Sequence, residues 1–405
     1  MKQNQPPWKK QAALFLASQN ISLFGSSVVG FSVIWHITLE TSSGTWMMLA
    51  TICSALPQIL ISLFGGVWAD RHNRKVLIML ADGVIALVTL ALAVAALLGY
   101  QQLELILVAL AIRSAGAGVQ TPAVNAVYPQ LVPQESLTKV QGINQTLSSV
   151  LLLLSPAVGG MLLGSVGIVA AYFVDVATAA LAIVVMARLR LEKIERKEEQ
   201  TSVWQDLKGG VQYTMKNAQL RRLVLCGLFS FFLITPAGVL SPLMVERSFG
   251  SEVWRLTANE LVWSVGSLAG GLFVSLKGKF KDKVLTIALC LVGFGVMFTL
   301  LGVAGNFVVF LVLMGIAGLF MPVLATAQTV HIQEITPSSV LGRVFSIVQI
   351  VSASAMPVAI LLFGPLADRV SVESILFVSG ILLALVGVVY GLSARSGKKP
   401  GSAAE

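Results

Sequence analysis

Long apolar stretches recur along the whole chain, and each is close to the roughly 20 residues that a helix needs to cross the hydrocarbon core of a bilayer. Of the 405 residues, 56% are hydrophobic and only 12% are charged, whereas a soluble domain carries about 25% charged residues. A membrane β-barrel would instead show short segments of alternating apolar and polar residues. The pattern therefore predicts an all-α membrane protein that crosses the bilayer many times.

Twelve of these stretches are predicted to span the membrane. They cover residues 11–38, 44–68, 76–99, 103–127, 138–165, 168–188, 218–245, 255–276, 284–304, 306–330, 341–366 and 372–394. The first follows "MKQNQPPWKK" and has no small-residue cleavage site before further apolar sequence. We therefore expect a retained helix rather than a signal peptide that is removed.

Basic residues fall mostly on one side of these spans. If the N-terminus lies inside, the outer loops hold only Arg247, Arg255 and Arg369 among the 28 Lys and Arg residues. The positive-inside rule then predicts that both termini are cytoplasmic, in a multi-pass protein of the cytoplasmic membrane of a bacterium. The net charge of +9 faces anionic lipid headgroups in this arrangement, so no nucleic-acid partner is needed to explain it.

A polar segment between the sixth and seventh spans divides the chain. We predict an N-terminal six-helix bundle over residues 1–188, a cytoplasmic amphipathic linker over 189–217, and a C-terminal six-helix bundle with a short cytoplasmic tail over 218–405. The linker carries apolar residues at near-helical spacing, which is typical of a helix at a membrane surface. A solvated linker is the alternative. The apolar positions are Leu191, Ile194, Val203, Leu207 and Val211.

The two halves resemble each other weakly. The segment "GAGVQTPAVNAVYPQLVP" (116–133) parallels "GLFMPVLATAQTVHIQEITP" (318–337), and a proline lies inside both the fifth span (Pro156) and the eleventh span (Pro357). Internal repeats of helical halves are typical of alternating-access carriers.

Several segments also resemble a known family. The stretch "GGVWADRHNRKVL" (65–77) resembles the loop between the second and third helices of major facilitator superfamily carriers. The segments "IRSAGAGVQTPAVNAVYPQLVPQESL" (112–137), "SPAVGG" (155–160) and "LGRVFSIV" (341–348) are similar to the macrolide-efflux (Mef-type) drug exporters. The resemblance implies the major facilitator fold, with twelve transmembrane helices in two pseudo-symmetric six-helix bundles, and drug export by proton antiport.

The charged loop after the second span is predicted to act as a conformational latch. Asp70 is expected to contact the N-terminus of the eleventh span near Gly342, where free amides favour an anion. Arg71 and Arg74 are expected to bind carboxylates or lipid phosphates, and Asp82 is expected to pair with one of them. A plain topology signal is the alternative for the basic residues. The latch residues are Gly65, Asp70, Arg71, Arg74, Asp82 and Gly342.

An antiporter motif of the family falls in the fifth span. The family pattern is Gly, eight residues, Gly, three residues, Gly-Pro, two residues and Gly-Gly. In this chain Leu151 and Ser155 replace two of the glycines. The remaining residues suit either a bendable seam between helices or plain packing. They are Gly142, Pro156, Gly159 and Gly160.

A central charge in a membrane span costs at least about 2.5–3.5 kcal/mol, and four ionisable residues stand out inside the predicted spans, namely Arg113, Asp175, Glu260 and Asp82. Arg113 is expected near the middle of the bilayer, and Asp175 is expected at a depth within reach of the Arg113 side chain. We therefore predict that the two residues share a network. The resemblance implies proton coupling for the arginine of the fourth helix, and a structural ion pair is the alternative. Glu260 is a further candidate coupling acid, and His36 is either a titratable group or an interfacial anchor. The proton-coupling candidates are Glu260, Asp175, Arg113 and His36.

Polar residues at helical spacing in the first helices of each repeat are predicted to line a substrate cavity. Sites for amphipathic small molecules are mostly apolar with a few polar anchors, and ordinary helix packing is the alternative for each residue. The candidates are Gln19, Ser22, Asn144, Gln145, Ser148 and Gln349.

The sequence therefore predicts a secondary active transporter that exports amphipathic, macrolide-like drugs by proton antiport with rocker-switch alternating access. Export or flipping of a lysophospholipid, a siderophore or another natural metabolite is the alternative. No nucleotide-binding loop, metal-ligand spacing or nucleophile constellation occurs in the sequence, so we expect no cofactor, no metal and no enzymatic activity. The expected partners are the drug, protons and membrane lipids, and a monomer suffices.

Overall fold

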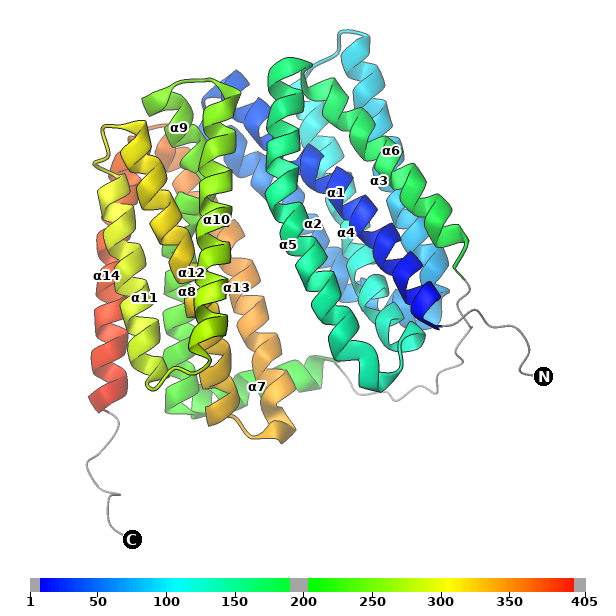
Figure 1. The fold of residues 1–405 in the computed structure, drawn as a ribbon. Helices are drawn as coiled ribbons and strands as arrows, with labels where there is room; N and C mark the ends of the chain where they lie inside the picture. The colour runs from blue at the N-terminus through cyan, green and yellow to red at the C-terminus, as the bar shows by residue number, and fades with distance from the viewer. Residues whose placement is uncertain (1–7, 190–202, 397–405) are drawn as a thin grey trace, which may run out of the picture. The chain divides into compact units, whose positions relative to one another are not determined.

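The computed structural model describes residues 8–189 and 203–396 and is almost entirely helical in these ranges (Figure 1). Leu191 and Ile194 of the predicted amphipathic linker lie outside the described residues. The helices are α1 (Trp8–Thr41), α2 (Gly44–Arg71), α3 (Arg74–Leu97), α4 (Leu103–Leu131), α5 (Gln134–Ser165), α6 (Ile168–Ala187), α7 (Val203–Lys216), α8 (Ala218–Val239), α9 (Ser241–Phe249), α10 (Val253–Lys277), α11 (Lys283–Leu301), α12 (Phe307–Ile335), α13 (Ser338–Ala367) and α14 (Val372–Ser396).

Within the described ranges, 11 helices are long and apolar enough to cross a membrane, and they coincide with eleven of the predicted spans. The predicted span 255–276 coincides with α10, which is 25 residues long but less apolar because it carries Asn259 and Glu260. The predicted all-α membrane fold is confirmed, although the apolar helices do not add up to the predicted twelve.

The seventh predicted span, 218–245, is not one helix. It divides at Leu240, where α8 ends and α9 begins. Pro242 lies in the first turn of α9, a position that proline tolerates because the amide there has no intrahelical acceptor. Pro242 is therefore compatible with a new helix that begins at Ser241.

The helices fall into two compact units. The first unit holds α1, α3 to α6, α2 from Leu49 onward, and α10 up to Thr257. The second unit holds α7 to α9, α11 to α14, the remainder of α10, and the start of α2 up to Met48. The predicted boundaries after residues 188 and 217 stay a prediction.

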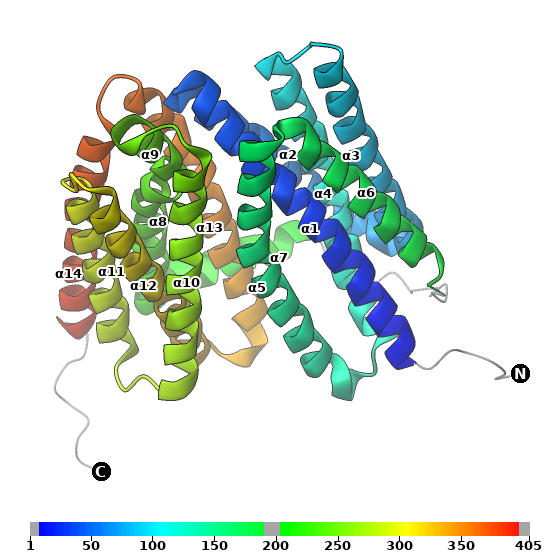
Figure 2. The same ribbon diagram turned by 45° about the horizontal axis from the view of Figure 1, so that its top comes forward.

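The same pattern of helix packing occurs in both units (Figures 1 and 2). In the first unit α1 packs against α5 and α6, and α3 packs against α4 and α6. In the second unit α8 packs against α13 and α14, and α11 packs against α12 and α14. Helices α1, α3, α4, α5 and α6 thus correspond to α8, α11, α12, α13 and α14.

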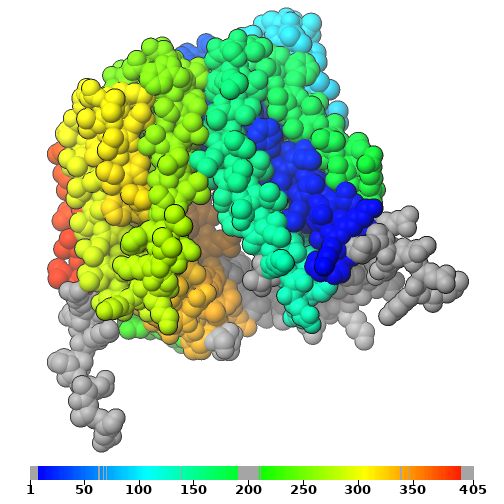
Figure 3. Space-filling view, viewed as in Figure 1, coloured from blue at the N-terminus to red at the C-terminus, as the bar shows by residue number. Residues whose placement is uncertain are grey.

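Large apolar side chains cover the outer surface of both units. Leu87 on α3 and Leu392 on α14 are each 66% exposed. Helix α5, which lies beside α1 on the surface of the first unit in Figure 3, exposes Leu152 and Leu154. Such a surface is unfavourable in water and suits lipid.

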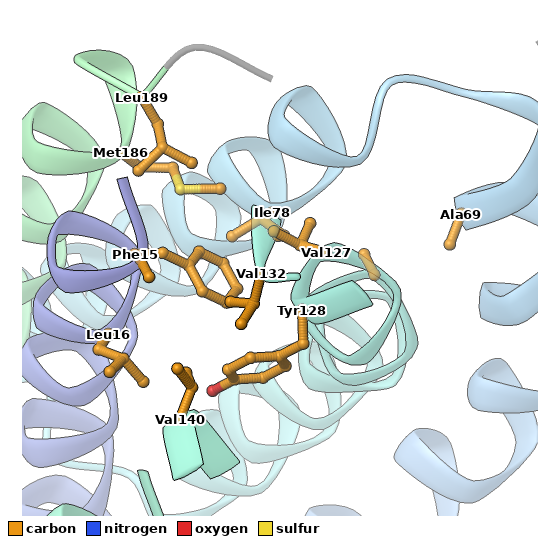
Figure 4. Close-up of a cluster of buried hydrophobic side chains, with 12 residues drawn as sticks. Phe15, Leu16, Ala69, Ile78, Val127, Tyr128, Val132, Val140, Met186 and Leu189 are labelled. Atoms are coloured by element: carbon orange, nitrogen blue, oxygen red, sulfur yellow. The ribbon is translucent and has the colours of Figure 1, made fainter. Parts of the chain in front are cut away.

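A cluster of buried apolar side chains, here called the apolar end cluster, closes one end of the first unit (Figure 4). Phe15 of α1 meets Tyr128 of α4 edge to face, with ring centroids 5.1 Å apart. Met186 and Leu189 at the end of α6 are buried beside them. The cluster consists of Ala12, Phe15, Leu16, Ala69, Ile78, Ala123, Val127, Tyr128, Val132, Val140, Met186 and Leu189.

Two basic residues fasten the start of α3 at this same end. Arg74 donates to the carbonyls of Ala69 (3.0 Å) and Ala126 (2.8 Å), and Lys75 donates from Nζ to the carbonyls of Ala187 (2.7 Å) and Leu189 (2.8 Å). Cations near helix C-termini satisfy free carbonyls and complement the helix dipole. These residues therefore hold the ends of α2, α4 and α6 together.

An acid directly after α13 caps the start of α2 inside the second unit. Asp368 accepts hydrogen bonds from the amides of Gly44 (2.7 Å) and Thr45 (3.0 Å) and from the hydroxyl of Ser43 (3.0 Å). Partial burial raises the pKa of Asp368, whereas its hydrogen bonds lower it. The hydrogen bonds together have the larger effect, so the pKa lies below its usual value. A carboxylate at a helix N-terminus is stabilising, which explains why residues 43–48 group with the second unit.

Helices α2 and α4 approach closely at Gly65. A Cβ atom at this position would lie 2.5 Å from the carbonyl oxygen of Gly118, whereas a Cβ atom at the adjacent Gly66 would meet nothing within 4 Å. Small residues let the backbones of membrane helices approach. The first residue of the predicted latch loop is therefore a packing glycine.

We predict that Gly65→Ala destabilises the protein by about 1–3 kcal/mol, because overpacking forces the helix backbones apart. Gly66→Ala is the matched control and should leave stability unchanged. The measurement is the thermal unfolding midpoint of both variants in the same detergent. Equal midpoints for the two variants would contradict the close α2–α4 contact.

Candidate functional site

An open cavity of about 440 Å³ is lined by residues of α1, α2, α3, α4 and α5 in the first unit. Four of the predicted cavity residues line it, together with the predicted coupling residue Arg113. The lining residues are Gln19, Asn20, Ser22, Leu23, Ser26, Val29, Gly30, Ser54, Gln58, Ile85, Leu110, Arg113, Ser114, Ala117, Gln120, Thr121, Val124, Asn125, Tyr128, Asn144 and Ser148. The wall thus combines side-chain amides and hydroxyls with aliphatic groups, which is typical of a small-molecule site.

Two buried polar atoms on this wall have no hydrogen-bond partner within the described residues. They are Nε2 of Gln19, a donor, and Oδ1 of Asn20, an acceptor. The amide nitrogen of Asn20 donates to Oδ1 of Asn144 at 3.2 Å, which links α1 to α5. A buried polar atom without a partner is costly, so these two atoms are available to a bound molecule or to water.

A buried ion pair lies at the edge of the cavity. Arg113 of α4 donates from Nη1 to Oδ2 of Asp175 on α6 and also to the hydroxyl of Thr89 on α3. Thr89 donates to Oδ2 of Asp175 at 2.8 Å, and Ser26 of α1 donates to Oδ1 at 3.2 Å. Asp175 is fully buried, whereas Arg113 also lines the cavity. The structure thus brings the two charges of the predicted network together and joins four helices through them.

Asp82 of α3 lies beside the cavity rather than in the charged loop. Its Oδ1 accepts hydrogen bonds from Ser22 (2.7 Å) and Gln120 (2.8 Å), and its Oδ2 has no partner within the described part of the chain. The predicted ion pair of Asp82 with Arg71 or Arg74 is wrong. Asp82 follows Arg74 by eight residues, which places it about 12 Å further along the helix.

The other predicted cavity and coupling residues do not line this cavity. Gln145 is exposed on α5, one position after Asn144, and Gln349 is exposed on α13 of the second unit. His36 is half-buried on α1, and Glu260 is half-buried on α10 in the second unit. Their roles stay predictions.

The predicted latch is described only in part. The side chain of Asp70 lies outside the described residues, and Arg71 is exposed. Gly342 is exposed, and a Cβ atom there would meet nothing within 4 Å. Arg74 holds backbone carbonyls of α2 and α4, as given above, so part of its role is structural. The latch itself stays a prediction.

The residues of the antiporter-type motif differ in their surroundings. A Cβ atom at Gly159 would lie 3.1 Å from the hydroxyl of Ser32, and one at Gly160 would overlap Thr257. A Cβ atom at Gly142 would meet nothing within 4 Å, and Pro156 is buried inside α5. The Gly159–Gly160 pair therefore permits close helix contact, while Gly142 faces open space among the described residues.

Sequence reasoning missed the part of the cavity wall that α2 and α4 contribute. That wall includes Gln58 of α2 and three polar residues of α4, Gln120, Thr121 and Asn125. The amides at 120 and 125 are unusual inside an apolar span and lie on one side of the helix with Arg113. This polar face is the signal that identifies α4 as a cavity helix.

We predict that Asp175→Asn and Arg113→Gln each destabilise the protein by about 3–5 kcal/mol, because each leaves the other charge buried without its partner. The double variant removes both charges and should recover a substantial part of this loss. Thermal unfolding of the three variants in detergent forms a double-mutant cycle that measures the coupling. Additive losses in the double variant would contradict a direct ion pair.

Comparison with known proteins agrees with this architecture. A sequence profile of the transmembrane secretion effector family matches residues 6–399. Macrolide efflux protein A of Streptococcus pyogenes is 30% identical over 386 residues, which cover 94% of this chain and 95% of the relative. Multidrug efflux pump Tap of Mycolicibacterium fortuitum is 23% identical over 379 residues, which cover 90% of each chain.

Solved structures share the fold. A POT family transporter in complex with 5-aminolevulinic acid has a TM-score of 0.75 and 12% identity, with coverage of 96% of this chain and 97% of that chain. A bacterial homologue of the iron transporter ferroportin, in an inward-facing state, has a TM-score of 0.71 and 15% identity, with coverage of 96% and 100%. These likenesses concern the fold alone. The chain therefore belongs to the transmembrane secretion effector family, on the macrolide-efflux branch of the major facilitator superfamily of transporters.

Proposed function

We propose that this protein exports amphipathic, macrolide-like drugs across the cytoplasmic membrane of a bacterium by proton antiport. The observation that carries the proposal is the cavity of about 440 Å³ inside the first unit, with Arg113 of the buried ion pair on its wall. The names of the relatives, macrolide efflux protein A and multidrug efflux pump Tap, support this cargo class.

The chemistry of the wall suits a large molecule that carries many oxygens and one cationic amine. Amides such as Gln19 and Asn144 offer hydrogen bonds to hydroxyl and carbonyl groups, and Leu110 and Val124 offer apolar surface. Asp82, one layer behind Ser22 and Gln120, supplies negative potential without a basic partner in the described residues. A positively charged drug is attracted to such a site.

Coupling follows from the electrostatics of the ion pair. With Asp175 ionised, Arg113 is neutralised, and the net field in the cavity comes from Asp82. With Asp175 protonated, Arg113 is an uncompensated cation on the cavity wall, and it repels a cationic drug. Proton binding and drug binding therefore oppose each other, as antiport requires. Glu260 and His36 are the alternative coupling groups.

The repeated packing of the two units supports rocker-switch alternating access, in which the two units move as bodies. In this scheme both termini lie in the cytoplasm, a single chain suffices, and the loop with Asp70, Arg71 and Arg74 stabilises one of the two states. Protons enter from outside and leave on the cytoplasmic side as the drug moves outward.

We predict that Asn144→Ala raises the concentration of macrolide at half-maximal transport by about two- to tenfold, the usual effect of removing one neutral hydrogen bond. Gln145→Ala, its exposed neighbour on α5, is the matched control and should transport normally. Uptake of labelled macrolide into inverted vesicles measures both. Equal effects at the two positions would exclude this cavity as the drug site.

We predict that the double variant Arg113→Gln/Asp175→Asn still lets macrolide equilibrate but loses accumulation driven by an imposed proton gradient. The double variant is preferred because neither residue is left as an unpaired buried charge. Glu252→Gln, an exposed acid at the start of α10, controls for loss of a carboxylate. If the double variant accumulates drug and Glu260→Gln does not, Glu260 is the coupling acid.

Failure of any macrolide to accumulate in vesicles with folded wild-type protein would contradict the drug assignment. A lysophospholipid, a siderophore or another natural metabolite would then be the cargo on the same fold. A siderophore anion fits this wall poorly, because Arg113 is the sole basic residue among the lining residues of the cavity.

A further inference from the structure

A second large cavity, of about 380 Å³, lies within the second unit and differs from the first in its charges. It opens where four helices begin or end. Its walls come from the start of α8, from the start of α11 with the residues just before it, and from the last turns of α12 and α14. Its lining residues are Ala218, Gln219, Arg222, Lys281, Asp282, Lys283, Val284, His331, Glu334 and Tyr390.

The two acids of this lining are already engaged. Oδ1 of Asp282 accepts the amide of Leu285 at 2.9 Å and so caps α11. Glu334 forms an ion pair with Lys283, with 2.7 Å between Nζ and Oε1. Neither acid forms an ion pair with Arg222 or Lys281 among the described residues.

The remaining basic groups are positioned for an anion. Arg222 uses Nη1 to donate to the carbonyl of Ser393 at 2.7 Å, which orients the guanidinium and leaves its other N–H groups for a ligand. Lys281 is exposed and has no ion pair in the ranges 8–189 and 203–396. His331 of α12 also lines the cavity. An arginine fork with a lysine is the usual protein environment of a phosphate group.

The first unit provides an internal comparison. The corresponding helices α1, α3, α4 and α6 meet at the apolar end cluster, where Phe15, Tyr128 and Leu189 fill the space (Figure 4). The four-helix arrangement is therefore compatible with a filled apolar core. In the second unit, cations and a cavity occupy the corresponding helix ends, so the cavity is a feature of these side chains and not a consequence of the packing pattern.

We propose that this cavity is a binding site for a single phosphate group, here called the phosphate cavity. Two sources share this chemistry, the headgroup of an anionic phospholipid and a free phosphate anion. The proposed topology, on which the lipid source rests, puts the cavity at the cytoplasmic surface, where anionic headgroups attract basic residues. A bound phosphate would bridge α8 to the loop before α11 and so stabilise the second unit.

The test uses the full-length protein in neutral detergent and requires no transport. Thermal stability is titrated with inorganic phosphate, with dihexanoyl-phosphatidylglycerol, and with zwitterionic dihexanoyl-phosphatidylcholine as the reference. A ligand that binds only the folded state raises the unfolding midpoint as its concentration exceeds the dissociation constant. Stabilisation by phosphate and phosphatidylglycerol indicates a free-phosphate site, and stabilisation by phosphatidylglycerol alone indicates a lipid site. Stabilisation by neither, or equally by phosphatidylcholine, overturns the proposal.

A matched pair of variants locates the site. Lys281→Gln removes a lining charge that makes no ion pair with the described residues, so folding should be unaffected. The phosphate concentration needed for half-maximal stabilisation should rise about tenfold, the usual effect of losing one charge-assisted hydrogen bond. Lys279→Gln removes the same charge two residues earlier, outside the lining, and should behave as wild type. Equal weakening in the two variants would indicate non-specific attraction and overturn the site.

The outcome is independent of the drug assignment. Vesicle transport of macrolide tests the first unit's cavity, and ligand-dependent stability tests the second unit's cavity. Loss of one result with retention of the other therefore identifies which proposal has failed.

Discussion

The ion pair between Arg113 and Asp175 is the interaction on which the first unit depends most. Either charge alone would be expensive inside a bilayer, and the pair is buried with hydrogen bonds from Thr89 and Ser26. These four residues belong to α4, α6, α3 and α1, so one network fixes the positions of four helices. Arg113 also lines the cavity, so the ion pair that stabilises the unit also places a charge on the cavity wall.

The two units share their packing pattern but not their chemistry. The first unit lines an open, amide-rich cavity that has Arg113 on its wall and the carboxylate of Asp82 behind it, and the apolar end cluster closes one end of the unit. The second unit carries Glu260 and the phosphate cavity, whose lining is strongly charged. Repeated packing supports the proposed motion of the units as bodies, and the different side chains are the basis for proposing cargo recognition in one unit and anion binding in the other.

Apolar length predicted the spans well, because the bilayer thickness imposes a minimum on every crossing helix. The Arg113–Asp175 network was predictable because a charge at mid-depth requires a partner. Cavity residues were predictable only in part. Asn144 and Gln145 both looked suitable, but adjacent helix positions point about 100° apart, and only Asn144 faces the cavity. The ion pair expected for Asp82 was wrong because the expectation ignored the rise along the helix between Arg74 and Asp82. The break at Leu240 depends on local backbone geometry, which the apolarity of a segment does not indicate.

The most direct test of coupling is the number of protons released when a macrolide binds to purified protein in weakly buffered detergent solution. If a proton on Asp175 and the drug oppose each other, wild-type protein should release a substantial fraction of one proton per drug bound. The variant Arg113→Gln/Asp175→Asn should bind drug and release none. The same proton release from both proteins would contradict the role of this ion pair.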